Sequence, residues 1–284
     1  MATGSGGVAS GSPLHLTALA SPMLYQLYVR WLGQMPPGAK ASLLRFEYLH
    51  NIGLALLSAA MLVGILLSIS KSGKGSTYYA LVCRRFEEDA LFELTAHAFF
   101  WSKIWEWGDT ALLVAKGKSI TWLHYTHHAS TCFLTGLNMT PVYNAMWSVV
   151  CATNSFVHAW MYLYYAHPRL LRWSRRLLTL AQMAQHAFVL ATGVYVVWRR
   201  YGGADTGGNA GNGGGGLEDC YNDSTPILVG LALYLMYLLF FAAFYKRRYA
   251  SSSGKAGKEA NGGTAAPVEA AAPAAKKGKQ KKEV

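Results

Sequence analysis

Charged side chains are scarce in this 284-residue sequence. Asp, Glu, Lys and Arg make up 14% of it, whereas hydrophobic residues make up 52%. Soluble domains carry about 25% charged residues, so this composition argues against one, although a large soluble α-helical protein stays as the alternative. The 17 Tyr and 9 Trp suit a protein with two boundaries between water and lipid. The composition therefore predicts a polytopic membrane protein.

Three further absences narrow the class of protein. Residues 1–13 lack the basic segment of a cleaved signal peptide, so we expect a flexible N-terminus that is not cleaved. The Gly-rich stretch 202–216 lacks a phosphate-binding pattern and is expected to be a connector. Cysteine is rare, with four in the chain. Cys132 and Cys151 fall within apolar segments and are expected to be small core residues.

The net charge of +12 is concentrated at the C-terminal end. Residues 249–284 lack apolar periodicity and are rich in Ala, Gly, Ser and Lys, so we expect a disordered basic tail. A basic tail beside a last membrane span suits anionic cytosolic lipid rather than nucleic acid, and no nucleic-acid partner is expected. Lys281 and Lys282 stand at the third and fourth positions from the last residue, where a dilysine ER-retrieval signal would lie.

Seven segments within residues 14–248 are apolar and long enough to span a bilayer. Four are clear, two are interrupted by polar side chains, and the first is weak. In chain order they are residues 14–34, 50–69, 91–115, 120–140, 142–165, 177–197 and 226–245. The predicted fold is thus an all-α integral membrane protein with seven transmembrane helices. Six spans would result if the first segment did not cross.

The distribution of Lys and Arg predicts the orientation. With a cytosolic C-terminus, the cytosolic loops hold eleven Lys and Arg and the opposite loops hold six. Cys83 and Cys220 then both face the oxidising lumen, which permits a disulfide between them. Asn222 begins a glycosylation sequon, but it lies so close to the last span that we expect it to be unused.

Polar side chains gather in four neighbouring apolar segments, where each would be costly without a partner or a polar cavity. They are Lys103, Glu106, Asp109 and Thr110; His124, His127 and His128; Asn154, His158, Met161, Tyr162, Tyr164 and Tyr165; and Thr179, Gln182, Gln185 and His186. The predicted topology brings all four sets to the cytosolic half at similar depth. A structural ion pair between Lys103 and Glu106 and hydrogen bonds between helices are the alternatives to a functional site.

Several imidazoles beside lipid suit two kinds of chemistry. A membrane di-iron oxygenase needs several histidine boxes, whereas this chain has one, and His15, His50 and His167 lie outside it. Acyl transfer needs a nucleophilic imidazole, a second histidine, and groups that stabilise an enolate and an oxyanion. The cluster supplies all of these, so we predict acyl transfer and no metal. A receptor or transporter is the non-enzymatic alternative, but the paired half-repeats of many transporters are missing.

The polar residues fall into four motifs that resemble those of the fatty-acid elongase (ELO) family. In order they are K-x-x-E-x-x-D-T, H-x-x-H-H, N-x-x-x-H-x-x-M-Y-x-Y-Y and T-x-x-Q-x-x-Q, and no motif position departs from the pattern. The resemblance covers about residues 15–248.

The resemblance implies a multi-pass protein of the endoplasmic reticulum membrane, with six of seven helices bundled around an acyl-CoA tunnel. It implies a 3-oxoacyl-CoA synthase that condenses long-chain acyl-CoA with malonyl-CoA, releases CO2 and CoA, and needs no metal or redox cofactor. A ketoreductase, a dehydratase and an enoyl reductase would complete the cycle as partners. Chain length and saturation of the acyl donor stay open, as does a homodimer.

The residue roles follow as a hypothesis. We expect His127 to take the acyl group, with His128 as the second candidate, and His158 to activate His127 or to position malonyl-CoA. His124, Gln182 and Gln185 would hold the tautomers and the thioester oxygen. The residues expected to bind substrate or CoA, or to orient other groups, are Lys103, Glu106, Asp109, Asn154, Tyr162, Tyr165, His186, Arg172, Arg175 and Arg176.

Overall fold

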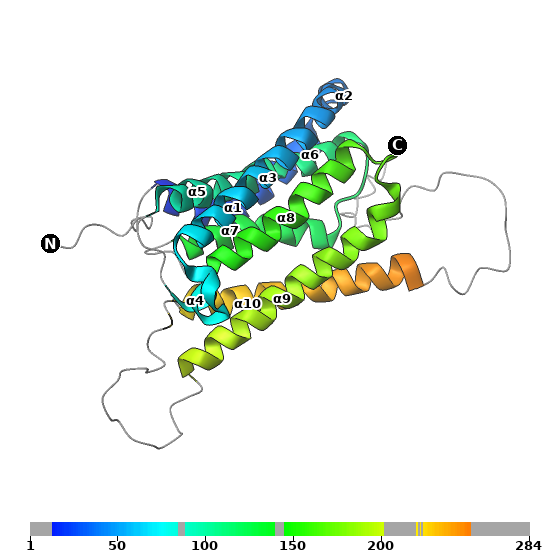
Figure 1. Ribbon diagram of the computed structural model, residues 1–284. Coiled ribbons are helices and arrows are strands. Elements are labelled where there is room, and N and C mark those ends of the chain that lie inside the picture. The colour runs from blue at the N-terminus through cyan, green and yellow to red at the C-terminus, as the bar shows by residue number, and fades with distance from the viewer. Residues whose placement is uncertain are drawn as a thin grey trace, which may run out of the picture.

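The computed structural model describes residues 13–84, 89–139, 145–201, 220, 222 and 224–250, and this part of the chain is helical, with no strand (Figure 1). Residues 1–12, the Gly-rich stretch 202–216 and residues 251–284, which include Lys281 and Lys282, lie outside the described residues. The long helices are α1 (Pro13–Gln34), α3 (Glu47–Lys71), α5 (Ala90–Trp105), α7 (Trp122–Asn138), α8 (Trp147–Ala166), α9 (Arg175–Tyr201) and α10 (Ser224–Tyr245). The shorter elements are α2 (Pro37–Leu43), α4 (Tyr78–Cys83), α6 (Trp107–Ala115), turns at Leu44–Phe46, Lys74–Ser76 and Arg172–Ser174, and a π-helical turn at Lys246–Ala250.

Local sequence accounts for several helix ends. The side chains of Thr77, Asp89 and Thr121 accept hydrogen bonds from backbone N–H groups in the first turns of α4, α5 and α7. Pro37 stands in the first turn of α2, where its missing N–H has no cost. Gly117 has a φ of 66°, which suits glycine and ends α6.

The sequence predicted one continuous helix over residues 91–115, but the structure has two helices there, α5 and α6. Glu106 ends α5 and begins α6. At this break the charged side chain of Glu106 is buried. Because two helix axes meet there, the periodicity of a single helix does not predict the direction of this side chain.

Three helical stretches within the described residues are long and apolar enough to cross a membrane. They are Pro37–Lys71, Arg172–Arg200 and Ser224–Tyr249. Their length and composition indicate a multi-pass membrane protein.

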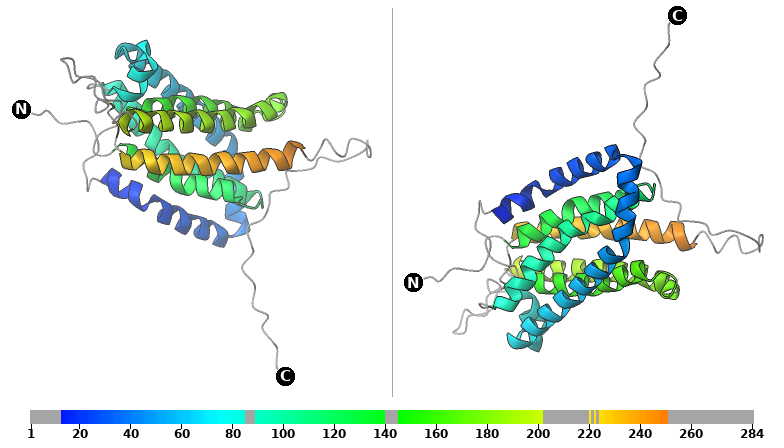
Figure 2. Two further views of the ribbon diagram at one scale, coloured as in Figure 1. Left: turned by 90° about the horizontal axis from the view of Figure 1, so that it is seen from below. Right: turned by 90° about the horizontal axis from the view of Figure 1, so that it is seen from above.

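Six of the described helices pack in a closed ring. Around the ring, α3 packs on α8, α8 on α9, α9 on α10, α10 on α7, α7 on α5, and α5 on α3. Helix α1 packs outside this ring on α7, and Figure 2 shows α10 lying between α9 and α7 with α1 at the edge. Side chains that point into the ring are therefore shielded by helices on all sides.

One end of the ring is joined by a disulfide and an asparagine. The disulfide links Cys83 at the end of α4 to Cys220, just before α10. Asn222 accepts a hydrogen bond from the backbone N–H of Met146 and donates one to the carbonyl oxygen of Val82. The starts of α8 and α10 are thereby tied to the end of α4.

Replacing Cys83 with serine is expected to lower the free energy of unfolding by about 2–5 kcal/mol, because the disulfide restrains two positions far apart in the chain. Thermal unfolding in detergent measures the change. Reductant should bring the wild-type midpoint down to that of the variant and leave the variant unmoved. Equal midpoints for all four samples would contradict the prediction.

Asn222 is expected to stay unglycosylated. Its side-chain nitrogen, to which a glycan would be attached, is buried and bonded to Val82. Treatment with a peptide N-glycosidase should leave the gel mobility unchanged. Gly211→Thr creates a sequon at Asn209 in the Gly-rich stretch and is the positive control for exposure of this region to the glycosylation machinery. A shift of the wild-type band would contradict the prediction.

Candidate active site

A pocket lies inside the ring and is polar at one end and apolar along the rest. Its polar lining comes from Lys103, His127, Asn154, Gln185, His186 and Tyr237. Toward the disulfide end the lining is mostly apolar, with a few polar side chains among it. The apolar residues are Leu134, Met146, Trp147, Val189, Pro226, Ile227 and Leu231, and the polar ones are Thr131, Thr135 and Asn138. This division suits a ligand with a reactive polar head and a hydrocarbon chain.

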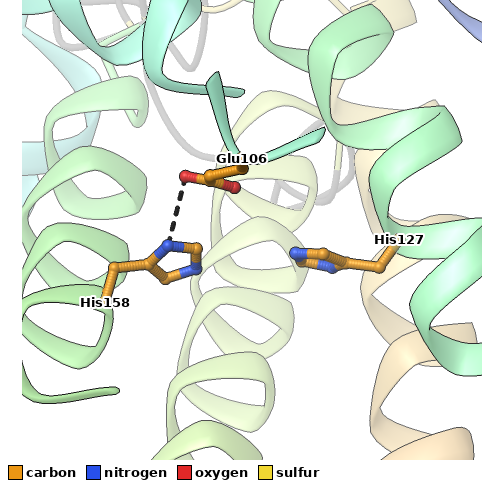
Figure 3. A group of neighbouring side chains, drawn as sticks. All are labelled: Glu106, His127 and His158. Atoms are coloured by element: carbon orange, nitrogen blue, oxygen red, sulfur yellow. Dashed lines mark ion pairs between the residues drawn. The ribbon is translucent and has the colours of Figure 1, made fainter. Parts of the chain in front are cut away.

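Two histidines and a glutamate meet beside the polar end, where His127 lines the pocket while His158 and Glu106 lie next to its lining. The rings of His127 and His158 face each other with a centroid distance of 6.5 Å, and Glu106 lies beside the gap between them (Figure 3). Nδ1 of His158 lies 3.2 Å from Oε1 of Glu106. This separation places the imidazole within ion-pair distance of the carboxylate, but Nδ1 of His158 makes no hydrogen bond among the described residues.

Lys103 supplies the positive charge at this end of the pocket. Its Nζ donates to Oε1 of Glu106 at 2.7 Å and to Oδ1 of Asn154 at 2.8 Å, and it lies over the ring of Phe99. Lys103 and Glu106 are 3% and 1% exposed, so each charge depends on the other for compensation. The sequence had assigned Lys103 to CoA phosphates, but its burial leaves no ammonium surface for them outside the pocket.

His127, not His128, borders the pocket. His127 lies against the ring of Tyr237 at 5.1 Å, and its Nδ1 is buried with no hydrogen-bond partner in the described part of the structure. His128 packs between Tyr25 and His124 and does not line the pocket. Accessibility thus favours His127 as the reactive imidazole.

His124 lies outside the pocket lining and is held from another direction. Its Nε2 is 2.9 Å from Oγ1 of Thr110, which in turn lies 2.8 Å from the hydroxyl of Tyr25 on α1. If His124 holds a histidine tautomer, as expected, it does so through its ring contact with His128, because it does not line the pocket where substrate would bind.

A second polar group surrounds Asp109. One carboxylate oxygen lies 2.8 Å from Nε2 of His50, and the other accepts a hydrogen bond from the Tyr162 hydroxyl at 2.6 Å. His50 was set aside because it lies outside the histidine cluster, and its partner Asp109 stands 59 positions away in the chain. Tyr25 and Tyr237 were missed because no local pattern marks their partners.

The polar residues of α9 divide differently from the prediction. Gln185 and His186 line the pocket, whereas the amide of Gln182 donates to the sulfur of Met161. Thr179 is bonded to the backbone of its own helix. Of the four polar residues of α9, Gln185 and His186 are thus the two that line the pocket.

Eight residues assigned to substrate or CoA lie outside the pocket lining, and four of the eight are exposed. The eight are Glu106, Asp109, Tyr162, Gln182, Tyr165, Arg172, Arg175 and Arg176. Tyr165 is 43% exposed, and its ring packs on those of Tyr162 and Tyr164. Arg172, Arg175 and Arg176 are exposed. Arg176 also donates to the hydroxyl of Tyr245 on α10. Any contact of the four exposed groups with substrate would be at the surface.

The Glu106, His127 and His158 group could in principle hold a metal ion, since one ligand atom from each lies within 4.8 Å of the others. However, the ammonium of Lys103 lies 2.7 Å from the carboxylate oxygen that also faces His158. A divalent cation would be repelled by that ammonium or would have to displace it. The donor set fits an ion-paired histidine better than a metal centre.

Known proteins resemble the chain over most of its length. The model of the ELO family, described as the GNS1/SUR4 family, matches residues 15–257. Fatty acid elongase A of Dictyostelium discoideum is 28% identical over 208 residues, covering 72% of this chain and 73% of the relative. Fatty acid elongase sre1 of the same organism is 26% identical over 241 residues, covering 82% and 84%. Very long chain fatty acid elongase 2 of Rattus norvegicus is 33% identical over 191 residues, covering 62% and 65%.

Proposed function

The chain belongs to the ELO (GNS1/SUR4) family, and from this premise we propose that it is a fatty acid elongase. It condenses a long-chain acyl-CoA with malonyl-CoA and yields a 3-oxoacyl-CoA two carbons longer, CO2 and CoA. The observation that carries the proposal is the facing pair His127 and His158, of which His127 lines the polar end of a pocket that continues between largely apolar side chains.

The surroundings of His127 and His158 differ in polarity, and this difference assigns one of the two substrates to each histidine. His127 lies on α7 beside Tyr237, and Leu134 follows it along the apolar lining, which suits the acyl chain. His158 lies beside Glu106, which shares the ammonium of Lys103 with Asn154. A cation and amide donors suit the carboxylate and thioester of malonyl-CoA.

In the first half of the reaction His127 attacks the thioester carbon of acyl-CoA. The new carbon–nitrogen bond forms as the carbon–sulfur bond breaks, and the ring proton of His127 leaves with the CoA sulfur as a thiol. An acyl-imidazole holds the acyl group in the pocket while free CoA departs.

In the second half malonyl-CoA enters on the side of His158. Its carboxylate leaves as CO2, and the electron pair left on the α-carbon forms a carbon–carbon bond to the acyl carbon. The acyl–nitrogen bond breaks, and His127 regains a proton from solvent by way of His158. Lys103 and the Asn154 amide stabilise the negative charge that develops on the malonyl thioester oxygen.

The same proposal covers the membrane arrangement. Seven spans cross the endoplasmic reticulum membrane with the C-terminus in the cytosol, and the ring of six helices encloses the acyl-CoA tunnel. The exposed Arg172, Arg175 and Arg176 bind the phosphates of CoA at the cytosolic surface. Lys281 and Lys282 retrieve the protein to the endoplasmic reticulum, and a ketoreductase, a dehydratase and an enoyl reductase complete the cycle. No metal or redox cofactor takes part in the condensation.

Microsomes carrying the chain provide the direct test. Incubated with radiolabelled malonyl-CoA and acyl-CoA donors of different length and saturation, they should incorporate label into a longer acyl product. Microsomes without the chain set the background, and His158→Ala should return incorporation to it. Absence of label with every donor would favour a receptor or transporter over an enzyme.

A further inference from the structure

The pair of His50 and Asp109 lies outside the pocket lining, yet it is connected to the histidine that faces malonyl-CoA in the proposed function. His50 is on α3, Asp109 is in the first turn of α6, and their side chains are 11% and 14% exposed. The second oxygen of Asp109 holds the hydroxyl of Tyr162, whose ring lies edge-on to that of His158 at 5.7 Å. The carboxylate of Asp109 thus connects His50 to Tyr162, the residue that packs against His158.

Asp109 also reaches the other neighbour of His158. Its backbone N–H donates to the carbonyl oxygen of Glu106 at 3.0 Å, in the turn where α5 ends and α6 begins. Glu106 contacts Nδ1 of His158. Any movement of Asp109 is therefore transmitted to His158 along two routes, one through Tyr162 and one through Glu106.

Gly108 shows that the backbone makes room for this imidazole. A Cβ atom at position 108 would lie 2.5 Å from Cε1 and 2.9 Å from Nδ1 of His50. Real Cβ contacts are not that short, so any side chain larger than glycine would displace His50. The ring of His50 is also bounded by Trp105 and Tyr162, at 6.4 Å and 6.3 Å. The imidazole is fitted on several sides and is not an incidental surface group.

The histidines of α7 are supported separately. Thr110, which follows Asp109 in the chain, contacts His124 and Tyr25, and the ring of His124 packs against that of His128. Adjacent side chains of α6 thus support opposite walls of the gap: Thr110 supports the H-x-x-H-H helix, and Asp109 supports α8. Loss of His50 should consequently affect one half of the reaction and spare the other.

On the basis of the proposed function, we propose that His50, Asp109 and Tyr162 form a positioning unit for His158 and Glu106, and that His50 is required for the malonyl-CoA half of the reaction. His50 does not touch the substrate. It fixes the carboxylate of Asp109, which in turn holds α6 and α8 at the separation that points His158 into the gap.

Steady-state kinetics separate the two halves, because in a ping-pong reaction kcat/KM for each substrate reports its own half. His50→Leu should lower kcat/KM for malonyl-CoA by about 10- to 100-fold, the effect of losing a hydrogen bond to a charged group. It should leave kcat/KM for acyl-CoA within about twofold. His50→Gln keeps an N–H donor near the position of Nε2 and should restore most of the malonyl-CoA activity.

Two further variants separate positioning from stability. Gly108→Ala adds a good helix former, which usually stabilises a helix, yet it should reproduce the loss seen in His50→Leu because it displaces the ring. Tyr78→Phe removes a part-buried hydrogen bond to Thr192 at the opposite end of the ring and is the matched control. It should lower the thermal midpoint without changing either kcat/KM.

The outcomes distinguish the two proposals. Equal losses for both substrates, no loss for malonyl-CoA, or a Gln variant no better than the Leu variant would each overturn the role of His50 and leave the elongase proposal intact. A wild-type protein that makes no 3-oxoacyl product would overturn the proposed function and this inference with it. Initial-velocity lines that intersect would mean that both substrates bind before the chemistry, which would overturn the covalent intermediate and the assignment of His50 to one half, while the elongase activity itself would stand.

Discussion

Replacing His127 with alanine should abolish the covalent acyl adduct and lower the rate of product formation by about 10³-fold or more. The reason is positional. His127 borders the pocket, its Nδ1 has no hydrogen-bond partner among the described residues, and its ring faces that of His158. His128 lacks the access to the pocket that would let it replace its neighbour.

Intact-protein mass spectrometry measures the adduct. Wild-type protein incubated with acyl-CoA alone should gain the mass of one acyl group, and addition of malonyl-CoA should remove it. His97→Ala is the matched control, because His97 is a partly buried histidine of α5 that does not line the pocket. It should keep both the adduct and its turnover. An adduct that persists in His127→Ala would transfer the nucleophilic role elsewhere, with His128→Ala as the next variant to examine.

The partners of that histidine show how far sequence reasoning reaches. Spacing within a helix allowed Lys103 and Glu106 to neutralise each other, which was the structural alternative to a functional site, and it placed His124, His127 and His128 within one short segment. Both statements depend on positions a few residues apart. The family resemblance is confirmed by the family match over residues 15–257. These signals are local in the chain, so a single sequence contains them.

The supporting residues could not be found in that way. His50 meets Asp109 across 59 positions, and Tyr25 meets Thr110 across 85. Such contacts depend on which helices become neighbours, and helical periodicity does not encode this. Tyr237 is hidden for a different reason: α10 is apolar all round, so no face of it stands out as facing the pocket.

The break at Glu106 was unforeseeable for a related reason. Gly108 stands two positions after Glu106, but an isolated glycine within a helical pattern is usually tolerated and does not mark a break. The charge of Glu106 instead finds Lys103 on the preceding turn and His158 on another helix, and tertiary contacts override the helical propensity of the segment.

Removing one member of the Lys103 and Glu106 pair should cause the largest loss of stability of any single substitution considered. Lys103→Met leaves the carboxylate of Glu106 buried without its cation and should lower the free energy of unfolding by about 3–5 kcal/mol. Thermal unfolding in detergent measures the loss. Lys116→Met is the matched control, because Lys116 pairs with Glu47 at about one-third exposure, where such pairs contribute about 1 kcal/mol or less.

The double variant Lys103→Met with Glu106→Gln separates the structural role of the pair from its chemical one. Without a buried charge to compensate, it should recover much of the stability lost in Lys103→Met alone, since the cost arises from the unpaired carboxylate and not from the missing bond. Its condensing activity should stay low, because His158 has lost its anionic partner and the malonyl side of the gap has lost its cation. Recovery of activity together with stability would mean that the pair only holds α5 and α6 together. Recovery of neither would mean that the amide at position 106 cannot be accommodated between Lys103 and His158 at all.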